Sequence, residues 1–169
     1  PLYADPDRFG GGQHVTYGCG FLGVHADFTH HPTTGYRRAL NLLVYLNYLK
    51  EDEPSWAAEE LASSSLELWS PDMSRCVTRI APVFNRAVLF KTSATSYHGH
   101  PEPNRYTGTH HDYGQFYEEG RRSLAVYYYV PATPEDVRLK TTDYQPRPWE
   151  YTKRARKWFS THVWNRHGR

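Results

Sequence analysis

The segment at residues 37–47 alternates between two kinds of side chain, and this alternation constrains the fold more than any other stretch of the chain. Successive side chains on a β-strand point to opposite faces, so each kind of side chain occupies a face of its own. One face is aliphatic and the other carries polar tips: Leu40, Leu42, Val44 and Leu46 against Asn41, Leu43, Tyr45 and Asn47. We therefore predict a strand between an outer apolar core and a polar-lined cavity.

Several shorter segments also resemble strands and are separated by turn-forming residues. We predict strands at residues 13–18, 21–27, 66–69, 77–80, 87–90 and 123–130, and the start of another at 96–98 that Gly99 and Pro101 would interrupt. Residues 82–86 are expected to form a turn with Asn85 at its corner. Many short strands joined by turns indicate an all-β sandwich or jelly roll.

Composition agrees with a β-rich domain and excludes some classes of protein. Aromatic residues make up 15% of the 169 residues, and 14 residues are tyrosine, which favours strands. The length suits a single domain over residues 1–169, with its core at about 18–130. No apolar run is long enough to span a bilayer, and a net charge of +2 does not by itself favour nucleic acid. Cys19 and Cys76 are too few for a disulfide framework, so we expect a reducing, cytoplasmic setting.

The C-terminal segment differs in pattern from the rest of the chain. Between residues 149 and 165, aromatic and apolar side chains recur at helical spacing, with lysine and arginine on the other sides. We predict a basic amphipathic helix whose apolar side packs on the sheet. An RNA-binding role for its basic side is disfavoured, because basic helix faces are usually just solvated.

Residues 25–27 read His-Ala-Asp and form the strongest candidate for chemistry. On a strand, His25 and Asp27 point to the same face and can contact one metal ion, whereas on a helix they would diverge. His98 stands near the start of another predicted strand. Two imidazoles and one carboxylate can hold a ferrous ion while leaving coordination positions open. The triplet alone also fits a surface strand with a hydrogen-bonded histidine. Rival ligands are His14, His30, His31, His100, His110 and His111.

Two adjacent arginines open the strong strand at residues 123–130. By alternation, Arg121 shares a face with the small residues Ser123 and Ala125, whereas Arg122 shares one with Leu124. A guanidinium pairs well with a carboxylate, so we predict that Arg121 binds the carboxylate of a cosubstrate, with Ser123 as a hydroxyl donor beside it. Tyr45 is a further candidate donor. The alternative for Arg121 is a solvated charge at the end of a strand.

Taken in order along the chain, these segments resemble a known family. The segments are Gly23-Val24-His25-Ala26-Asp27-Phe28, the run Arg37–Asn47, Leu66-Glu67-Leu68-Trp69, the run Pro82–Arg86, Ser96-Tyr97-His98-Gly99 and the run Arg121–Tyr129. Their succession is similar to the Fe(II)- and 2-oxoglutarate-dependent oxygenases of the prolyl 4-hydroxylase-like group, over roughly residues 18–130.

The resemblance implies a double-stranded β-helix, a cupin-like jelly roll with few flanking helices. It also implies Fe(II) bound by His25, Asp27 and His98, and 2-oxoglutarate bound by Arg121 with help from Tyr45 and with Leu66 lining the same pocket. The reaction implied is hydroxylation of an unactivated C–H with dioxygen, on a prolyl residue of a protein or peptide, with ascorbate as an accessory reductant. The presence of Asp27 argues against the halogenating relatives.

Two departures from the family pattern limit what carries over. Residues 62–65 read Ala-Ser-Ser-Ser where relatives usually have a glycine pair, and the loop at 101–120 is longer than is typical. Four other functions stay open: a hydroxylase of a free amino acid or small metabolite, a nucleic-acid demethylase, a three-histidine dioxygenase using His100, and a non-catalytic β-helix binding module. The demethylase lacks a supporting groove of basic and aromatic residues, and the three-histidine site leaves Arg121 unexplained.

Overall fold

The structure is a computed structural model that describes residues 1–17, 20–47, 63–102, 120–136 and 140–150. Its secondary structure is almost entirely β: β1 (Tyr3–Ala4), β2 (Gly12–Thr16), β3 (Leu22–Ala26), β4 (Arg37–Tyr45), β5 (Leu66–Trp69), β6 (Cys76–Ile80), β7 (Ala87–Lys91), β8 (His98–His100), β9 (Arg121–Val130) and β10 (Asp143–Tyr144). Two 3-10 turns, η1 (Pro134–Asp136) and η2 (Pro148–Glu150), complete the described elements. The predicted all-β core is therefore confirmed. Across the described ranges, no helix has the length and apolar character needed to cross a bilayer.

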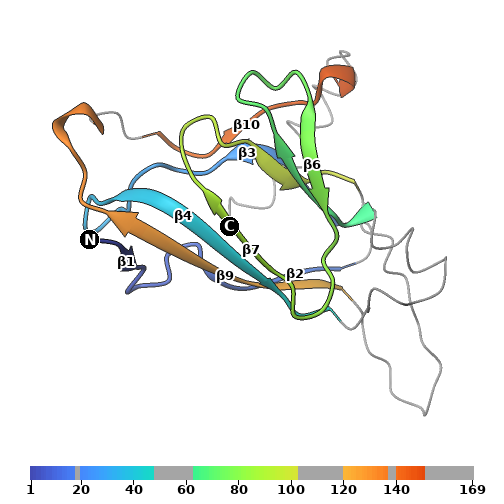
Figure 1. The fold of residues 1–169 in the computed structure, drawn as a ribbon, viewed down its shortest axis with the longest axis horizontal. Coiled ribbons are helices and arrows are strands. Elements are labelled where there is room, and N and C mark those ends of the chain that lie inside the picture. The colour runs from blue at the N-terminus through green and yellow to red at the C-terminus, as the bar shows by residue number, and fades with distance from the viewer. Residues whose placement is uncertain (18–19, 48–62, 103–119, 137–139, 151–169) are drawn as a thin grey trace, which may run out of the picture.

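The strands form two antiparallel five-stranded sheets that face each other (Figure 1). One has the order β1-β9-β4-β7, with β2 also paired to β9, and the other has the order β10-β3-β8-β5-β6. The core between them draws on both sheets, because Leu66 of β5 packs with residues of the sheet that contains β4, β7 and β9: Leu43, Tyr45, Val88, Ala125, Tyr127 and Tyr129. Apolar side chains thus pack the two sheets together, and the same interior also contains the polar residues of the candidate site.

Strand β4 shows the alternation that the sequence predicts. Its polar-tipped face is inside, where Asn41, Leu43, Tyr45 and Asn47 are all buried. The aliphatic face is less covered than we predicted: Leu46 is 39% exposed, and its neighbours on the same face of the sheet, Leu89 and Leu124, are 60% and 40% exposed. The described residues therefore do not supply the outer core expected over this face.

A one-residue bulge near the start of β4 changes which side chains point inward. Arg38 pairs with Tyr129 of β9 and Leu40 pairs with the adjacent Tyr128, so Ala39 is the extra residue. Such a bulge shifts the alternation by one position. Arg38 consequently lies inside, 2% exposed, on the same side as Asn41.

The second sheet differs from the prediction at two strands. We predicted that Gly99 would interrupt a strand, but β8 runs through it. A Cβ at this position would lie only 2.8 Å from the carbonyl oxygens of Leu22 and Gly23, so a larger residue would not fit there. Glycine is what lets β8 approach β3 this closely. Strand β10, which pairs with Ala26 and His25, was not predicted.

Other predicted features have mixed outcomes. Asn85 adopts a left-handed conformation with φ of 62°, in the turn where a corner was expected. Of the predicted C-terminal helix at 149–165, Trp149 and Glu150 lie in a 3-10 turn, and the rest lies outside the described residues. His110 and His111 also lie outside them, as do most of the loop at 101–120 and Cys19.

Candidate metal and cosubstrate site

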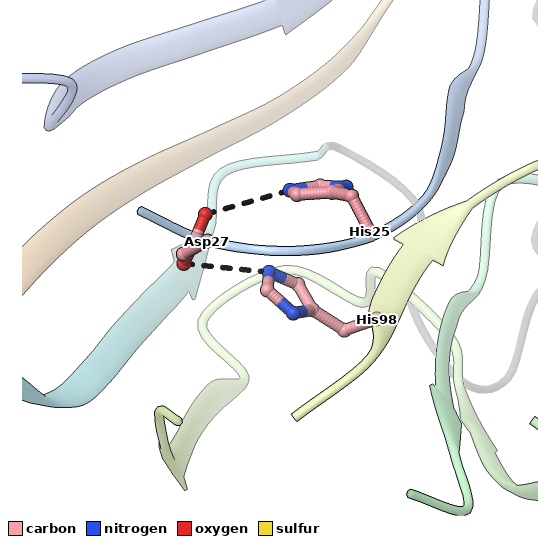
Figure 2. Close-up of side chains that lie close together, drawn as sticks. All are labelled: His25, Asp27 and His98. Carbon is pink, nitrogen blue, oxygen red and sulfur yellow. Dashed lines mark ion pairs between the residues drawn. The ribbon is translucent and has the colours of Figure 1, made fainter. Parts of the chain in front are cut away.

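Three of the predicted site residues meet at one point between the two sheets. His25 lies on β3, Asp27 follows directly after that strand, and His98 begins β8, where it pairs with His25 across the sheet. One ligand atom from each residue lies within 4.8 Å of the others, an arrangement that could hold a metal ion. Figure 2 shows both imidazole rings directed toward the Asp27 carboxylate, at 3.5 Å from His25 Nε2 to Oδ1 and 3.7 Å from His98 Nε2 to Oδ2.

The backbone fixes the orientation of both imidazole rings. His25 Nδ1 lies 2.9 Å from the carbonyl oxygen of Gly23, and His98 Nδ1 lies 2.9 Å from that of Ser96. A carbonyl oxygen only accepts hydrogen bonds, so each Nδ1 must carry the proton. Each Nε2 then presents its lone pair to the space beside Asp27, which is the tautomer that metal-binding histidines use.

Burial and neighbouring charges set the protonation states needed for metal binding. Burial tends to raise the pKa of Asp27, but the adjacent His25 imidazole and, after it, His98 and the Arg38 cation outweigh burial and hold the pKa well below its usual value. Burial, and then the nearby His25, lower the pKa of His98 to about 4. At neutral pH the site therefore offers an ionised carboxylate and a neutral imidazole, the forms that bind a divalent cation.

Arg38 lies against this cluster and was not among the predicted site residues. Its Nη1 lies 3.0 Å from Asp27 Oδ2, and its side chain is 1% exposed. Alternation counted from Leu40 places Arg38 on the outer face of β4, and only the bulge at Ala39 brings it inside. The sequence offered one signal for this role of Arg38. Arg37 and Arg38 are adjacent at the start of a predicted strand, ten residues after the candidate ligand Asp27.

The residues predicted to bind a cosubstrate lie together elsewhere in the same interior. Arg121 is 4% exposed, with its Nε donating to the carbonyl oxygen of Ser64 at 2.9 Å and its Nη2 donating to the Tyr45 hydroxyl at 3.3 Å. Ser123 and Leu66 are buried as well, and burial raises the pKa of Tyr45 although Arg121 opposes the shift. The predicted parity of β9 is therefore correct, since Arg121 and Ser123 point inward. Whether these residues bind a cosubstrate stays a prediction.

His100 connects the two groups of residues. It is 5% exposed, and burial, followed by the nearby charges of Arg121 and His25, holds its pKa well below the usual value. The cluster of ligand atoms contains His98 and not His100, so among the described residues the geometry does not favour the three-histidine alternative. The Nδ1 of His100 and the Oδ1 of Asn41 are both buried without a hydrogen-bond partner among the described residues. Buried polar atoms normally have partners, so this interior is suited to a polar ligand.

A pocket of about 240 Å³ opens beside Asp27. Its lining is rich in charged and hydroxyl groups, among them Asp27, Arg37, Arg38, Thr92, Asp136 and Lys140. Arg37 is paired with Asp136 at 3.3 Å, and Arg38 with Asp27. Asp27, one of the three candidate metal ligands, thus lies in the wall of a space that a small group could enter.

Comparison with known families identifies the chain. Residues 12–109, more than half of the sequence, match the family model of the 2OG-Fe(II) oxygenase superfamily. The chain belongs to this superfamily. The match includes His25, Asp27 and His98 but ends before Arg121, so the case for Arg121 rests on the structure around it. No curated protein shows a significant match to the sequence.

Membership in the oxygenase superfamily accounts for several features of the site. The family implies a dioxygenase that uses Fe(II) and 2-oxoglutarate, and a jelly-roll fold with which the two antiparallel sheets agree. The donor set fits that metal, since two imidazoles and one carboxylate are the ligands that non-haem iron oxygenases use. The prolyl 4-hydroxylase-like subgroup, in contrast, rests on sequence resemblance alone.

Proposed function

We propose that this oxygenase hydroxylates an unactivated C–H bond and that His25, Asp27 and His98 hold its ferrous ion. The observation that carries the proposal is the convergence of these three side chains, within 4.8 Å, in the interior that also contains the buried Arg121. When bound, iron and 2-oxoglutarate supply the activation of dioxygen that is coupled to decarboxylation of the cosubstrate to succinate. Ascorbate would serve only as an accessory reductant.

The residues around Arg121 would bind the distal carboxylate of 2-oxoglutarate. A guanidinium in a buried setting pairs strongly with a carboxylate and cannot lose its charge. The Tyr45 hydroxyl, already 3.3 Å from Arg121 Nη2, would add a donor, and Ser123 would add another from the adjacent position on the same face of β9. Leu66, 2% exposed, would pack against the carbon chain of the cosubstrate.

A prolyl residue of a protein or peptide is the first candidate substrate, by resemblance to the prolyl 4-hydroxylase-like group. A free amino acid or small metabolite is the second, supported by the modest volume of the pocket beside Asp27 and by the cations Arg37 and Lys140 in its lining. The pocket beside Asp27 is where the reacting carbon of either substrate would enter. The proposal involves no membrane or nucleic-acid partner, and a cytoplasmic setting remains part of it.

The test is to supply purified protein with Fe(II), 2-oxoglutarate and a panel of proline-containing peptides and free amino acids. We expect succinate to form, slowly without a substrate and faster with the correct one, together with a mass gain of one oxygen atom on that substrate. Binding of panel members without any succinate would instead support the non-catalytic binding module.

A further inference from the structure

Arg38 has the largest fully buried side chain among the described residues, and it lies beside the candidate metal site. Its guanidinium carbon lies 3.7 Å from the centre of the Phe28 ring and 3.7 Å from that of the Tyr127 ring. Two aromatic faces at this distance both attract the cation and hold its plane in place. The Nη2 atom also donates a hydrogen bond to the Tyr129 hydroxyl at 3.2 Å. Two aromatic rings and one hydroxyl therefore fix the position of the guanidinium, in addition to its contact with Asp27.

The two carboxylate oxygens of Asp27 have different neighbours. Oδ1 faces His25 Nε2 at 3.5 Å, whereas Oδ2 lies 3.0 Å from Arg38 Nη1 and 3.7 Å from His98 Nε2. Oδ2 nevertheless has no aligned hydrogen-bond donor among the described residues, so its contact with Arg38 is that of opposite charges packed together. Because an arginine keeps its charge at any ordinary pH, this attraction to Oδ2 is permanent.

We propose that Arg38 is a positioning residue for the iron site: it engages one oxygen of Asp27 and so leaves the carboxylate to bind the metal through the other. The inference rests on the proposed function. A carboxylate that binds through both oxygens takes two coordination positions in place of one. A site with two imidazoles and one carboxylate is useful to an oxygenase only while positions remain open for the cosubstrate and dioxygen. Arg38 would keep one of those positions available.

The first test compares Arg38→Met with wild type, using Co(II) as a spectroscopic substitute for Fe(II). Methionine keeps much of the length and apolar stem of the side chain but removes its charge. We expect Co(II) to bind to Arg38→Met with an altered visible absorption spectrum, because the carboxylate now binds through two oxygens. We also expect the Co(II)-loaded variant to bind 2-oxoglutarate more weakly, because the second carboxylate oxygen occupies a position that the cosubstrate needs. Removing a residue that orients a metal ligand typically lowers metal affinity or activity roughly 10–100-fold.

Two further variants separate positioning from general stability. Arg38→Lys keeps a cation near Oδ2 and should recover most of the 2-oxoglutarate affinity. Arg79→Met is the matched control, since Arg79 Nη2 pairs at 2.9 Å with the buried Glu67. Glu67 lies on β5 next to Leu68, the partner of His98, so alternation directs its side chain to the opposite face of the sheet from His98. Arg79→Met should lower the thermal stability of the apo protein but leave the Co(II) spectrum and the 2-oxoglutarate affinity unchanged.

If Arg38→Met does not fold, Tyr129→Phe provides the decisive measurement. It removes the hydroxyl that holds Arg38 Nη2 and keeps the charge, so we expect a smaller loss of 2-oxoglutarate affinity and a change of the Co(II) spectrum in the same direction. Wild-type spectra and affinities in Arg38→Met, or in Tyr129→Phe when it alone folds, would overturn the positioning role. Failure of the proposed function looks different, because wild-type protein itself would then bind neither Co(II) nor 2-oxoglutarate.

Discussion

The interior holds two buried arginines, and their surroundings differ. Arg38 contacts the carboxylate of Asp27 and is clamped between the rings of Phe28 and Tyr127. Arg121 donates to a backbone carbonyl, that of Ser64, and to the hydroxyl of Tyr45. Arg38 thus lies against a charged group of the candidate metal site, whereas these two hydrogen bonds of Arg121 go to a backbone carbonyl and a hydroxyl.

This difference fits two separate proposed roles, positioning of Asp27 by Arg38 and binding of the cosubstrate by Arg121. At the metal end, burying a charge beside Asp27 costs desolvation, which the ion pair and the two aromatic faces offset. At the other end, the buried guanidinium of Arg121 beside the Tyr45 hydroxyl would bind the carboxylate of the cosubstrate. If that division is correct, substitutions at the two ends should fail in different assays.

The largest effect is expected at the metal end, from His98→Ala. Removing one of three ligands should abolish tight binding of Fe(II) or Co(II) and lower succinate formation to background, because the remaining pair cannot hold the ion. Metal binding is measured by titration with Co(II), and turnover by succinate formation.

His14→Ala is the control for this variant, since the side chain of His14 is exposed on β2 and hydrogen-bonds to the Gly10 carbonyl. Wild-type metal affinity in His98→Ala would mean that a different set of residues binds the ion, His100 being the first to examine.

A smaller and different effect is expected from Arg121→Ala. The variant should still bind Co(II), but its apparent KM for 2-oxoglutarate should rise roughly 10–100-fold, the cost of losing a buried partner for a carboxylate. Arg122→Ala, on the neighbouring and more exposed face of β9, is the matched control and should change KM little. The opposite ranking of the two variants would place the cosubstrate on the other face of the strand, and the comparison of the two ends would fail.

The sequence predicted which of these site residues point into the interior, because side chains alternate regularly along a strand. Alternation along β4 and β9 places Tyr45, Arg121 and Ser123 on inward faces, and the structure buries all three. The spacing of His25 and Asp27 was sufficient to put both on one side of an extended segment. In each of these cases the backbone is a regular strand, so the position of a residue in the sequence determines the face of the sheet to which its side chain points.

What the sequence did not predict lies where that regularity breaks. Arg38 is inside because of the bulge at Ala39, which depends on how β4 pairs with β9 and leaves no mark on the alternating pattern. Gly99 was expected to interrupt a strand, yet it permits β8 to pack against the carbonyls of Leu22 and Gly23. Both features arise from contacts between distant segments, and a single sequence contains no periodic signal for them.

The smallest expected effect concerns acid stability at the metal end. Because the pKa of His98 falls to about 4 in the folded protein from 6.5, the unfolded chain binds a proton between these values and the folded protein does not. Stability of the apo protein should therefore decline as the pH falls below 6.5, by roughly 1–3 kcal/mol in total from this residue. The pKa of Asp27 is also lowered, but its contribution is retained until the pH falls toward 3.8 and below, so His98 acts first.

Urea unfolding of the apo protein from about pH 7.5 to about pH 5 would measure this decline, with His98→Gln as the comparison because glutamine does not titrate in that range. Other histidines contribute to both proteins, so the informative quantity is the difference between the two pH profiles. We expect wild type to lose stability faster than His98→Gln over this range. Parallel profiles would mean that His98 is protonated as readily in the fold as in water. Burial would then not keep the proton off this ligand below pH 6.5, and a divalent cation would have to displace that proton in order to bind.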